Sequence, residues 1–219
     1  MKAIGNIHLI WRLGKGSRRI SVGTIKKSAS EGIRFHYNQE GVEDANKLGF
    51  VHYEGFPDTS KDKMYTENVI EIFGQRLMRS ERPDLHDFYD FWNIDPLKKE
   101  DKYYMLAFTQ GLLPTDNFEF LADFNPVNNF SFVTEITNLS EAQIPSAKIS
   151  IGDVLRYELE ANNTYDKNAV KVYKEELYLG HIKLIHCKVF HKTNKQFSLK
   201  VKGIEKNGVI KRVFVEAAL

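Results

Sequence analysis

The sequence contains one cysteine, Cys187, in 219 residues. A single cysteine cannot build an intrachain disulfide framework and fits a reducing compartment. No apolar run approaches the roughly 20 residues that a membrane helix needs. The N-terminal segment MKAIGNIHLIWRLGKGS also has no sustained apolar stretch followed by a small-residue cleavage site. We therefore expect a cytoplasmic protein without a signal peptide and without a membrane partner.

Motifs of catalysis are scarce as well. The chain has no GxSxG elbow and no HExxH pair, and Cys187 has no paired setting that would activate a thiol. The segment GKGSRR at residues 14–19 is glycine-rich and basic, but a strand follows it, whereas a phosphate loop leads into a helix. We expect no enzyme, no catalytic residue and no cofactor.

Two groups of residues leave minor alternatives open. The first is a possible soft-metal site, for which Cys187 and His191 would share one helical face, although no CxxC pair or second ligand cluster accompanies it. Its members are His181, His186, Cys187 and His191. The second could serve a metal-dependent nuclease, although acidic residues are common beside turns. Its members are Glu158, Glu160, Asp166 and Lys167. The prediction for metals is none.

The net charge of +2 hides an asymmetry. Residues 127–219 carry 14 Lys and Arg against 10 Asp and Glu, whereas residues 1–126 carry 17 against 19. Between residues 183 and 212 only Glu205 is acidic. The basic residues there are Lys183, Lys188, Lys192, Lys195, Lys200, Lys202, Lys206, Lys211 and Arg212. Such an excess is typical of a surface that binds a polyanion, and the alternative is a solvated lysine-rich face.

The periodicity of apolar residues changes along the chain. Residues 7–13, 19–25 and 32–37 alternate as strands, and helical spacing follows in residues 66–78, with Thr66 as N-cap, and in 82–92 and 101–108. The segment FNPVNNF, residues 124–130, is the best boundary because proline and asparagine interrupt regular structure. We predict a mixed α/β module at 1–126 and a second domain at 127–219.

The second domain reads as short strands with at most one short helix, KLIHCKVFHK. The strands are FSFVTEI, DVLRYELE, AVKVYKE, LYLGHI, QFSLKVKGI and VIKRVFVEA. Asn207-Gly208 between the last two is a strong hairpin signal. Many short strands in about ninety residues favour a small closed barrel, because closure removes exposed edges. The predicted fold class is α+β, with a mostly antiparallel barrel after the α/β module.

One stretch of the second domain carries a specific motif. Asn163, Tyr165, Asp166, Asn168 and Ala169 follow the pattern Asn-x-Tyr-Asp-x-Asn-Ala, and a hairpin leads on to Leu-Gly-His-Ile at residues 179–182. This stretch resembles the HIRAN domain family, and the resemblance covers about residues 128–219. It implies a small β-barrel related in shape to oligonucleotide-binding folds. It also implies DNA binding, since the member found in eukaryotic fork-remodelling helicases grips the 3′ end of single-stranded DNA.

The residue types in this motif agree with that role. A tyrosine over a groove offers a stacking face worth about 1–3 kcal/mol per base, and asparagines fix the loop through hydrogen bonds to the backbone. Lysines neutralise phosphates. The predicted nucleic-acid-binding residues are Asn163, Tyr165, Asp166, Lys167, Asn168, Tyr157, Lys183 and Lys188. The alternative is that Tyr165 plugs one end of the barrel.

The sequence also departs from the family pattern. Thr137 and Asn138 lie near the positions where the single-strand-binding member has an arginine and a tyrosine on its first strand, so recognition of a 3′ end is open. Tyr157, Tyr173 and Arg156 are possible substitutes, but strand alternation places Arg156 opposite Tyr157.

The N-terminal half resembles the leader region of bacterial HIRAN-domain proteins, and its opening strands resemble the N-terminal domain of HipA-type kinases. This resemblance implies an interaction or scaffolding module. The alternative function is therefore a protein-interaction module, for example an antitoxin-like or defence-system partner of a toxin, kinase or nuclease. The aromatic segment HYEGFP, residues 52–57, is the one hint of an exposed apolar patch, and core packing is the other interpretation.

Overall fold

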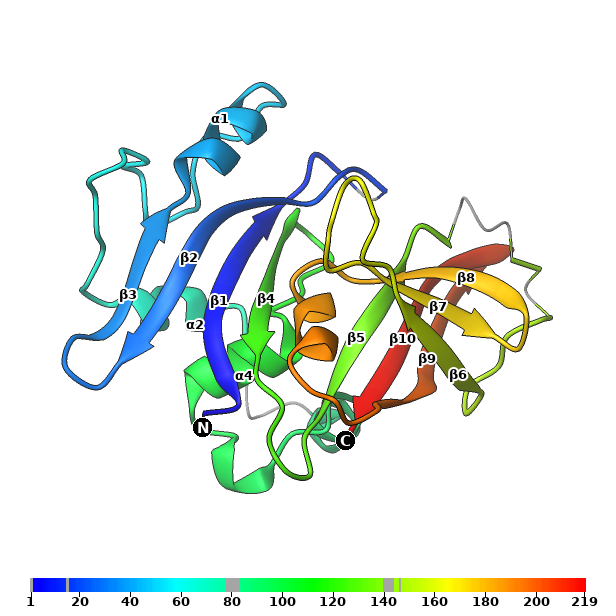
Figure 1. Cartoon of the computed structure of the whole chain (residues 1–219). Coiled ribbons are helices and arrows are strands. Elements are labelled where there is room, and N and C mark those ends of the chain that lie inside the picture. The colour runs from blue at the N-terminus through cyan, green and yellow to red at the C-terminus, as the bar shows by residue number, and fades with distance from the viewer. Residues whose placement is uncertain (1, 15, 78–82, 140–143, 146) are drawn as a thin grey trace. The chain divides into compact units, whose positions relative to one another are not determined.

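The computed structural model describes the chain except for residues 1, 15, 78–82, 140–143 and 146. It divides into two compact units (Figure 1). One unit holds Phe124–Leu219, Asp90–Asn93 and the N-terminal end up to Ala3, and the other holds Ile4–Tyr89 and Ile94–Asp123. The domain boundary at 126/127 stays a prediction.

The N-terminal unit is built on a four-stranded sheet. Its strands are β1 (Ile4–Trp11), β2 (Ile20–Ser28), β3 (Gly32–Tyr37) and β4 (Phe118–Phe124). They are ordered β3-β2-β1-β4, and β2 pairs antiparallel with both β1 and β3. The three strands predicted near the N-terminus are confirmed. The fourth was missed, because FEFLADF is buried at most positions and so shows no alternation.

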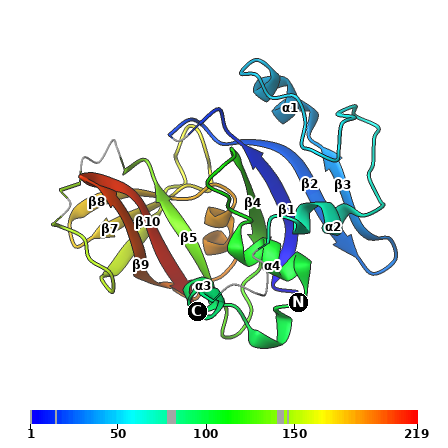
Figure 2. The ribbon, with the colours of Figure 1, turned by 180° about the vertical axis from the view of Figure 1, so that it is seen from behind.

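Short helices accompany this sheet, and α2 and α4 lie on the face turned toward the viewer in Figure 2. The helical segments are α1 (Gln39–Asn46), α2 (Val69–Gly74), η1 (Pro96–Lys98) and α4 (Lys102–Thr109). A further helix, α3 (Leu85–Trp92), ends in the other unit, where the Phe91 ring lies 5.3 Å from that of Phe214. At α4 the Asp101 carboxylate accepts the amide protons of Tyr103 and Tyr104, as an N-cap does. The predicted cap of α2 was wrong, because α2 begins after Asn68 and not after Thr66.

The aromatic residues of HYEGFP belong to the core of the N-terminal unit. Tyr53 is 7% exposed and Phe56 is 0% exposed. Their rings lie 4.9 and 4.8 Å from that of Phe73, and the hydroxyl of Tyr37 donates to the carbonyl of Phe56. The hint of an exposed apolar patch is therefore wrong, since these two rings are packed and not presented to a partner.

The second unit contains a closed, six-stranded antiparallel barrel in the order β10-β5-β8-β7-β6-β9. Its strands are β5 (Ser131–Thr137), β6 (Val154–Leu159), β7 (Val170–Lys174), β8 (Leu177–Ile182), β9 (Ser198–Asn207) and β10 (Val209–Ala218). The predicted barrel and the α+β class are confirmed. The hairpin at Asn207-Gly208 joins β9 to β10, with Gly208 at φ 71°.

Closure of the barrel depends on Gly180. A Cβ on this residue would lie 2.1 Å from the carbonyl oxygen of Thr137 on β5, and its φ of 137° is one that side-chain-bearing residues rarely adopt. The Thr137 hydroxyl in turn donates to the carbonyl of His181. The glycine of the Leu-Gly-His-Ile motif thus permits β8 to approach β5.

The predicted short helix is present as a 3₁₀ segment, η2 (His186–His191). Its Phe190 ring packs at 4.6 Å from Phe197 and 6.5 Å from Phe132, and its His186 Nδ1 lies 2.9 Å from the Thr134 hydroxyl. These contacts anchor η2 to β5 and to the start of β9. These contacts hold η2 in a fixed position against the barrel.

Candidate nucleic-acid interface

The motif residues form the loop between β6 and β7, drawn in yellow in Figure 1, and residues 163–168 are called the 163–168 loop below. The side-chain oxygen of Asn163 accepts the amide protons of Tyr165 and Asp166, both at 2.9 Å. Its side-chain NH₂ group donates to Glu160 at 2.9 Å. Asn163 thus shapes the turn that precedes the tyrosine, as its residue type predicted.

Tyr165 stands at the tip of this loop and is 98% exposed. Lys167 beside it is also exposed. A side chain that is open to solvent cannot fill the end of a barrel, so the alternative role of Tyr165 as a plug is wrong. The loop instead presents an uncovered aromatic ring next to a cation.

The base of the loop is tied to η2. Asp166 accepts the amide proton of Asn168 at 2.8 Å with one carboxylate oxygen, and the Cys187 thiol donates to the other at 3.4 Å. His191 Nε2 lies 3.0 Å from the carbonyl oxygen of Asn168. Asp166 and Asn168 therefore build the loop, whereas Thr164, Tyr165 and Lys167 are exposed to solvent.

Tyr157 does not join the loop. Its ring packs edge-on against Phe190 at 5.0 Å, and its hydroxyl accepts the amide proton of Phe197. Arg156 points the other way, and its guanidinium lies 4.1 Å from the ring of Tyr173. Of the three possible substitutes, Arg156 and Tyr173 thus come together on the outer face, whereas Tyr157 packs on η2.

Lys183 is not a surface lysine, and its predicted contact with phosphate is wrong. Its side chain is 0% exposed, and its ammonium group lies 2.9 Å from Glu135. Glu135 also accepts from Arg212 at 3.1 Å. A buried ammonium that is paired in this way cannot reach a phosphate in solvent.

The basic run from residue 183 therefore presents fewer exposed cations than its sequence indicated. Lys202 and Arg212 lie beside Glu216 and Glu205, respectively. The exposed members are Lys192, Lys195, Lys200, Lys206 and Lys211. Lys188 is half-buried and follows Cys187, whose thiol donates to Asp166 of the loop. It remains a candidate for phosphate contact together with Lys167.

Sequence reasoning missed how Glu160 joins the loop to the barrel wall. Its carboxylate accepts from Lys171 Nζ at 2.7 Å and lies 3.0 Å from His181 Nε2, besides its bond from Asn163. These bonds, that of Lys171 foremost, lower the pKa of Glu160 to about 2. Lys171 and His181 are cross-strand partners on β7 and β8, so the register of that hairpin could have revealed the pair.

The pKa of Cys187 is shifted upward, whereas that of Glu160 is shifted downward. Burial, and next the charge of Asp166, raise the pKa of its thiol to about 12. A thiol with such a pKa is protonated at neutral pH and is a poor nucleophile and metal ligand. Over the residues that the structure describes, no group of three His, Cys, Asp or Glu side chains could hold a metal ion.

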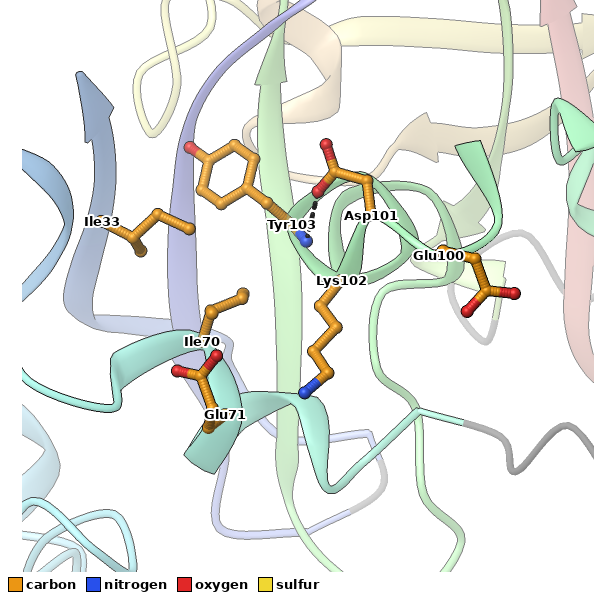
Figure 3. Close-up of a pocket in the computed structure, with 7 residues that line it drawn as sticks. All are labelled: Ile33, Ile70, Glu71, Glu100, Asp101, Lys102 and Tyr103. Carbon is orange, nitrogen blue, oxygen red and sulfur yellow. Dashed lines mark hydrogen bonds between the residues drawn. The ribbon is translucent and has the colours of Figure 1, made fainter. Parts of the chain in front are cut away.

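The N-terminal unit contains a hollow of about 310 Å³ (Figure 3). It is lined by Ile33, Ile70, Glu71, Glu100, Asp101, Lys102 and Tyr103. The Asp101 carboxylate is used to cap α4 and to pair with Lys27 at 3.2 Å, and Glu100 points away from Tyr103 in the figure. Asp101 is therefore engaged elsewhere and Glu100 is turned away, so we assign this hollow no role.

In the described part of the chain, helices are too short or too polar to cross a membrane. No curated protein matches the sequence. The crystal structure of the HIRAN domain of human HLTF is similar to this chain at 19% identity and a TM-score of 0.32, over 40% of this chain and 74% of that one. The family model of the HIRAN domain matches residues 129–209, which include the barrel strands β5 to β8, the 163–168 loop and η2. Residues 129–209 of this chain therefore match the HIRAN domain family.

Proposed function

We propose that this protein is a non-enzymatic DNA-binding protein whose HIRAN domain binds single-stranded DNA or DNA ends through the 163–168 loop. The observation that carries the proposal is the 98% exposure of Tyr165 on a loop whose backbone amides are held by the side chains of Asn163 and Asp166. The faces of an exposed aromatic ring are apolar, so the ring gains free energy when it stacks on a partner. A nucleobase is a flat partner of matching shape.

Stacking of a base on Tyr165 predicts a preference for single strands. In a duplex the faces of the bases are covered by their neighbours, whereas a single strand or an end offers an open face to Tyr165. Lys167 and Lys188 then supply phosphate contacts beside the ring. The proposal does not extend to recognition of the 3′ end, since Thr137 donates to the carbonyl of His181 and takes part in the closure of the barrel.

The test is fluorescence anisotropy with labelled single-stranded, duplex and 3′-phosphorylated oligonucleotides at about 50 mM salt, where phosphate contacts are least screened. Tyr165→Ala is expected to weaken binding of the single strand by about 5- to 150-fold, the equivalent of one lost stacking contact. Tyr165→Phe keeps the ring and is the matched control, expected to bind within about twofold of the original protein.

Each other outcome has a definite meaning. Equal binding by the original protein and Tyr165→Ala would leave only a lysine surface, and no binding at all would reject the DNA-binding role. Because Tyr165 is exposed, both variants are expected to unfold at the original temperature, so a loss of affinity cannot be blamed on folding. Tyr53 and Phe56 are buried and so do not support the interaction-module alternative. That alternative rests on the resemblance of the N-terminal half to the leader region of bacterial HIRAN-domain proteins.

A further inference from the structure

Glu160 occupies the base of the 163–168 loop, directly after β6 ends at Leu159. Its amide donates to the carbonyl of Ala169 at 2.9 Å, which closes the loop, and its own carbonyl accepts the amide proton of Asn163 at 3.2 Å. Its carboxylate meets Lys171, His181 and the side chain of Asn163 at 2.7, 3.0 and 2.9 Å. One residue thus links the loop to strands β7 and β8.

The bond from Asn163 fixes which way its amide faces. The NH₂ group donates to Glu160, so the oxygen must face the other side, where it accepts the amide protons of Tyr165 and Asp166. Without the carboxylate, the Asn163 amide loses the bond on its NH₂ side and is held only by the N–H groups of Tyr165 and Asp166. The turn before Tyr165 therefore depends on a residue that lies outside it.

Tyr165 has no packing that could orient its side chain, because it is 98% exposed. Its position over any ligand is therefore set by the backbone of the turn. The other end of the loop is held separately by Cys187 and His191 of η2, through Asp166 and Asn168.

We propose that Glu160 is the positioning residue of the 163–168 loop: it holds the Asn163 amide in the one orientation that presents Tyr165 to nucleic acid, and it makes no contact with the nucleic acid itself. The proposal rests on the proposed function of the loop. It also gives Glu160 a role other than catalysis, since its oxygens are filled by Lys171, His181 and Asn163.

The first measurement needs no ligand. Amide hydrogen exchange is followed by NMR in the original protein, in Glu160→Ala and in Glu160→Gln, whose retained oxygen can still accept from Asn163. In Glu160→Ala the amides of Tyr165 and Asp166 are expected to exchange about tenfold faster or more, while that of Val172 in β7 is unchanged. Glu160→Gln is expected to stay near the original rates. Unchanged exchange at Tyr165 and Asp166 in Glu160→Ala would overturn the proposal.

The second measurement is a double-mutant cycle on single-stranded DNA. Removal of a carboxylate near a polyanion should by charge alone strengthen binding. A positioning role predicts the reverse, a loss of about fivefold or more in Glu160→Ala and no further loss when Tyr165→Ala is already present. Glu158→Ala is the control for charge, because Glu158 precedes Glu160 by two residues, is exposed and pairs with Arg156 instead of the loop.

The two failures can be told apart. The proposed function fails if the original protein binds no DNA, or if Tyr165→Ala binds DNA as tightly as the original protein. The hydrogen-exchange result is independent of this outcome. If Tyr165→Ala weakens binding but Glu160→Ala does not, or weakens it equally in both backgrounds, the role of Glu160 as a positioning residue is rejected.

Discussion

The ammonium group of Lys183 lies 2.9 Å from a carboxylate oxygen of Glu135, and neither side chain is open to solvent. Arg212 donates to the same carboxylate, and its guanidinium lies 4.4 Å from the ring of Phe214. Two cations thus share one buried anion on strands that the sequence separates widely. The first lysine of the basic run is in this way buried against the barrel strand β5, which carries Glu135.

Lys183→Met should therefore act on stability and not on phosphate contact. We expect a loss of about 2 kcal/mol in the free energy of unfolding, less than the roughly 3–5 of a broken buried pair, because Arg212 still neutralises Glu135. Urea unfolding measures it. Lys211→Met is the surface control and should change stability by no more than about 0.5 kcal/mol. Equal effects of the two substitutions would show that Lys183 is not buried.

The salt dependence of DNA binding should report the exposed lysine of the loop. Each phosphate contact contributes about 0.7 to the slope of log affinity against log salt for a single strand. Lys167→Ala is therefore expected to lower the slope by about that amount and to weaken binding to all sequences alike. The measurement is anisotropy over a series of salt concentrations. An unchanged slope would mean that Lys167 touches no phosphate.

Cys187 should resist alkylation, and it should lower the stability of the folded protein at alkaline pH. Its pKa is raised to about 12, so the folded state favours the neutral thiol. That stabilisation is complete below the unfolded pKa of about 9 and falls by roughly 1.4 kcal/mol per pH unit above it, until pH passes the folded value. Urea unfolding between pH 8 and 11 measures the slope. Cys187→Ala removes this thiol, and an identical slope in that variant would contradict the assignment.

At acidic pH, the contribution of Glu160 to stability should decrease as the pH falls. Its pKa is lowered to about 2, first by the hydrogen bond from Lys171. The stabilisation of the loop by the charged carboxylate is therefore present above the ordinary pKa near 4.5 and lost as pH falls toward about 2. Carbon NMR of the side-chain carboxyl in a pH titration measures it. Lys171→Met should move the titration upward, and no movement would show that another group sets this pKa.

Local chemistry made much of the fold readable from the sequence. Alternation located β3 and β8, Asn207-Gly208 located the last hairpin, and the Asn-x-Tyr-Asp-x-Asn-Ala pattern located the loop. The hairpin and the loop pattern are satisfied by neighbours within a few residues. The cap of α2 failed because Asn68, in the left-handed region at φ 52°, begins the helix two residues after Thr66.

The exposed or buried state of each candidate side chain was decided only by the tertiary structure. The sequence by itself determined that residues 163–168 form a hydrogen-bonded turn with a tyrosine in it, because asparagine and aspartate bond to amides two or three residues away. It did not determine that Tyr165 faces solvent, that Lys183 meets Glu135, or that Glu160 orients Asn163. The contacts of Lys183 with Glu135 and of Glu160 with Lys171 and His181 arise only when barrel closure and strand register bring distant segments together.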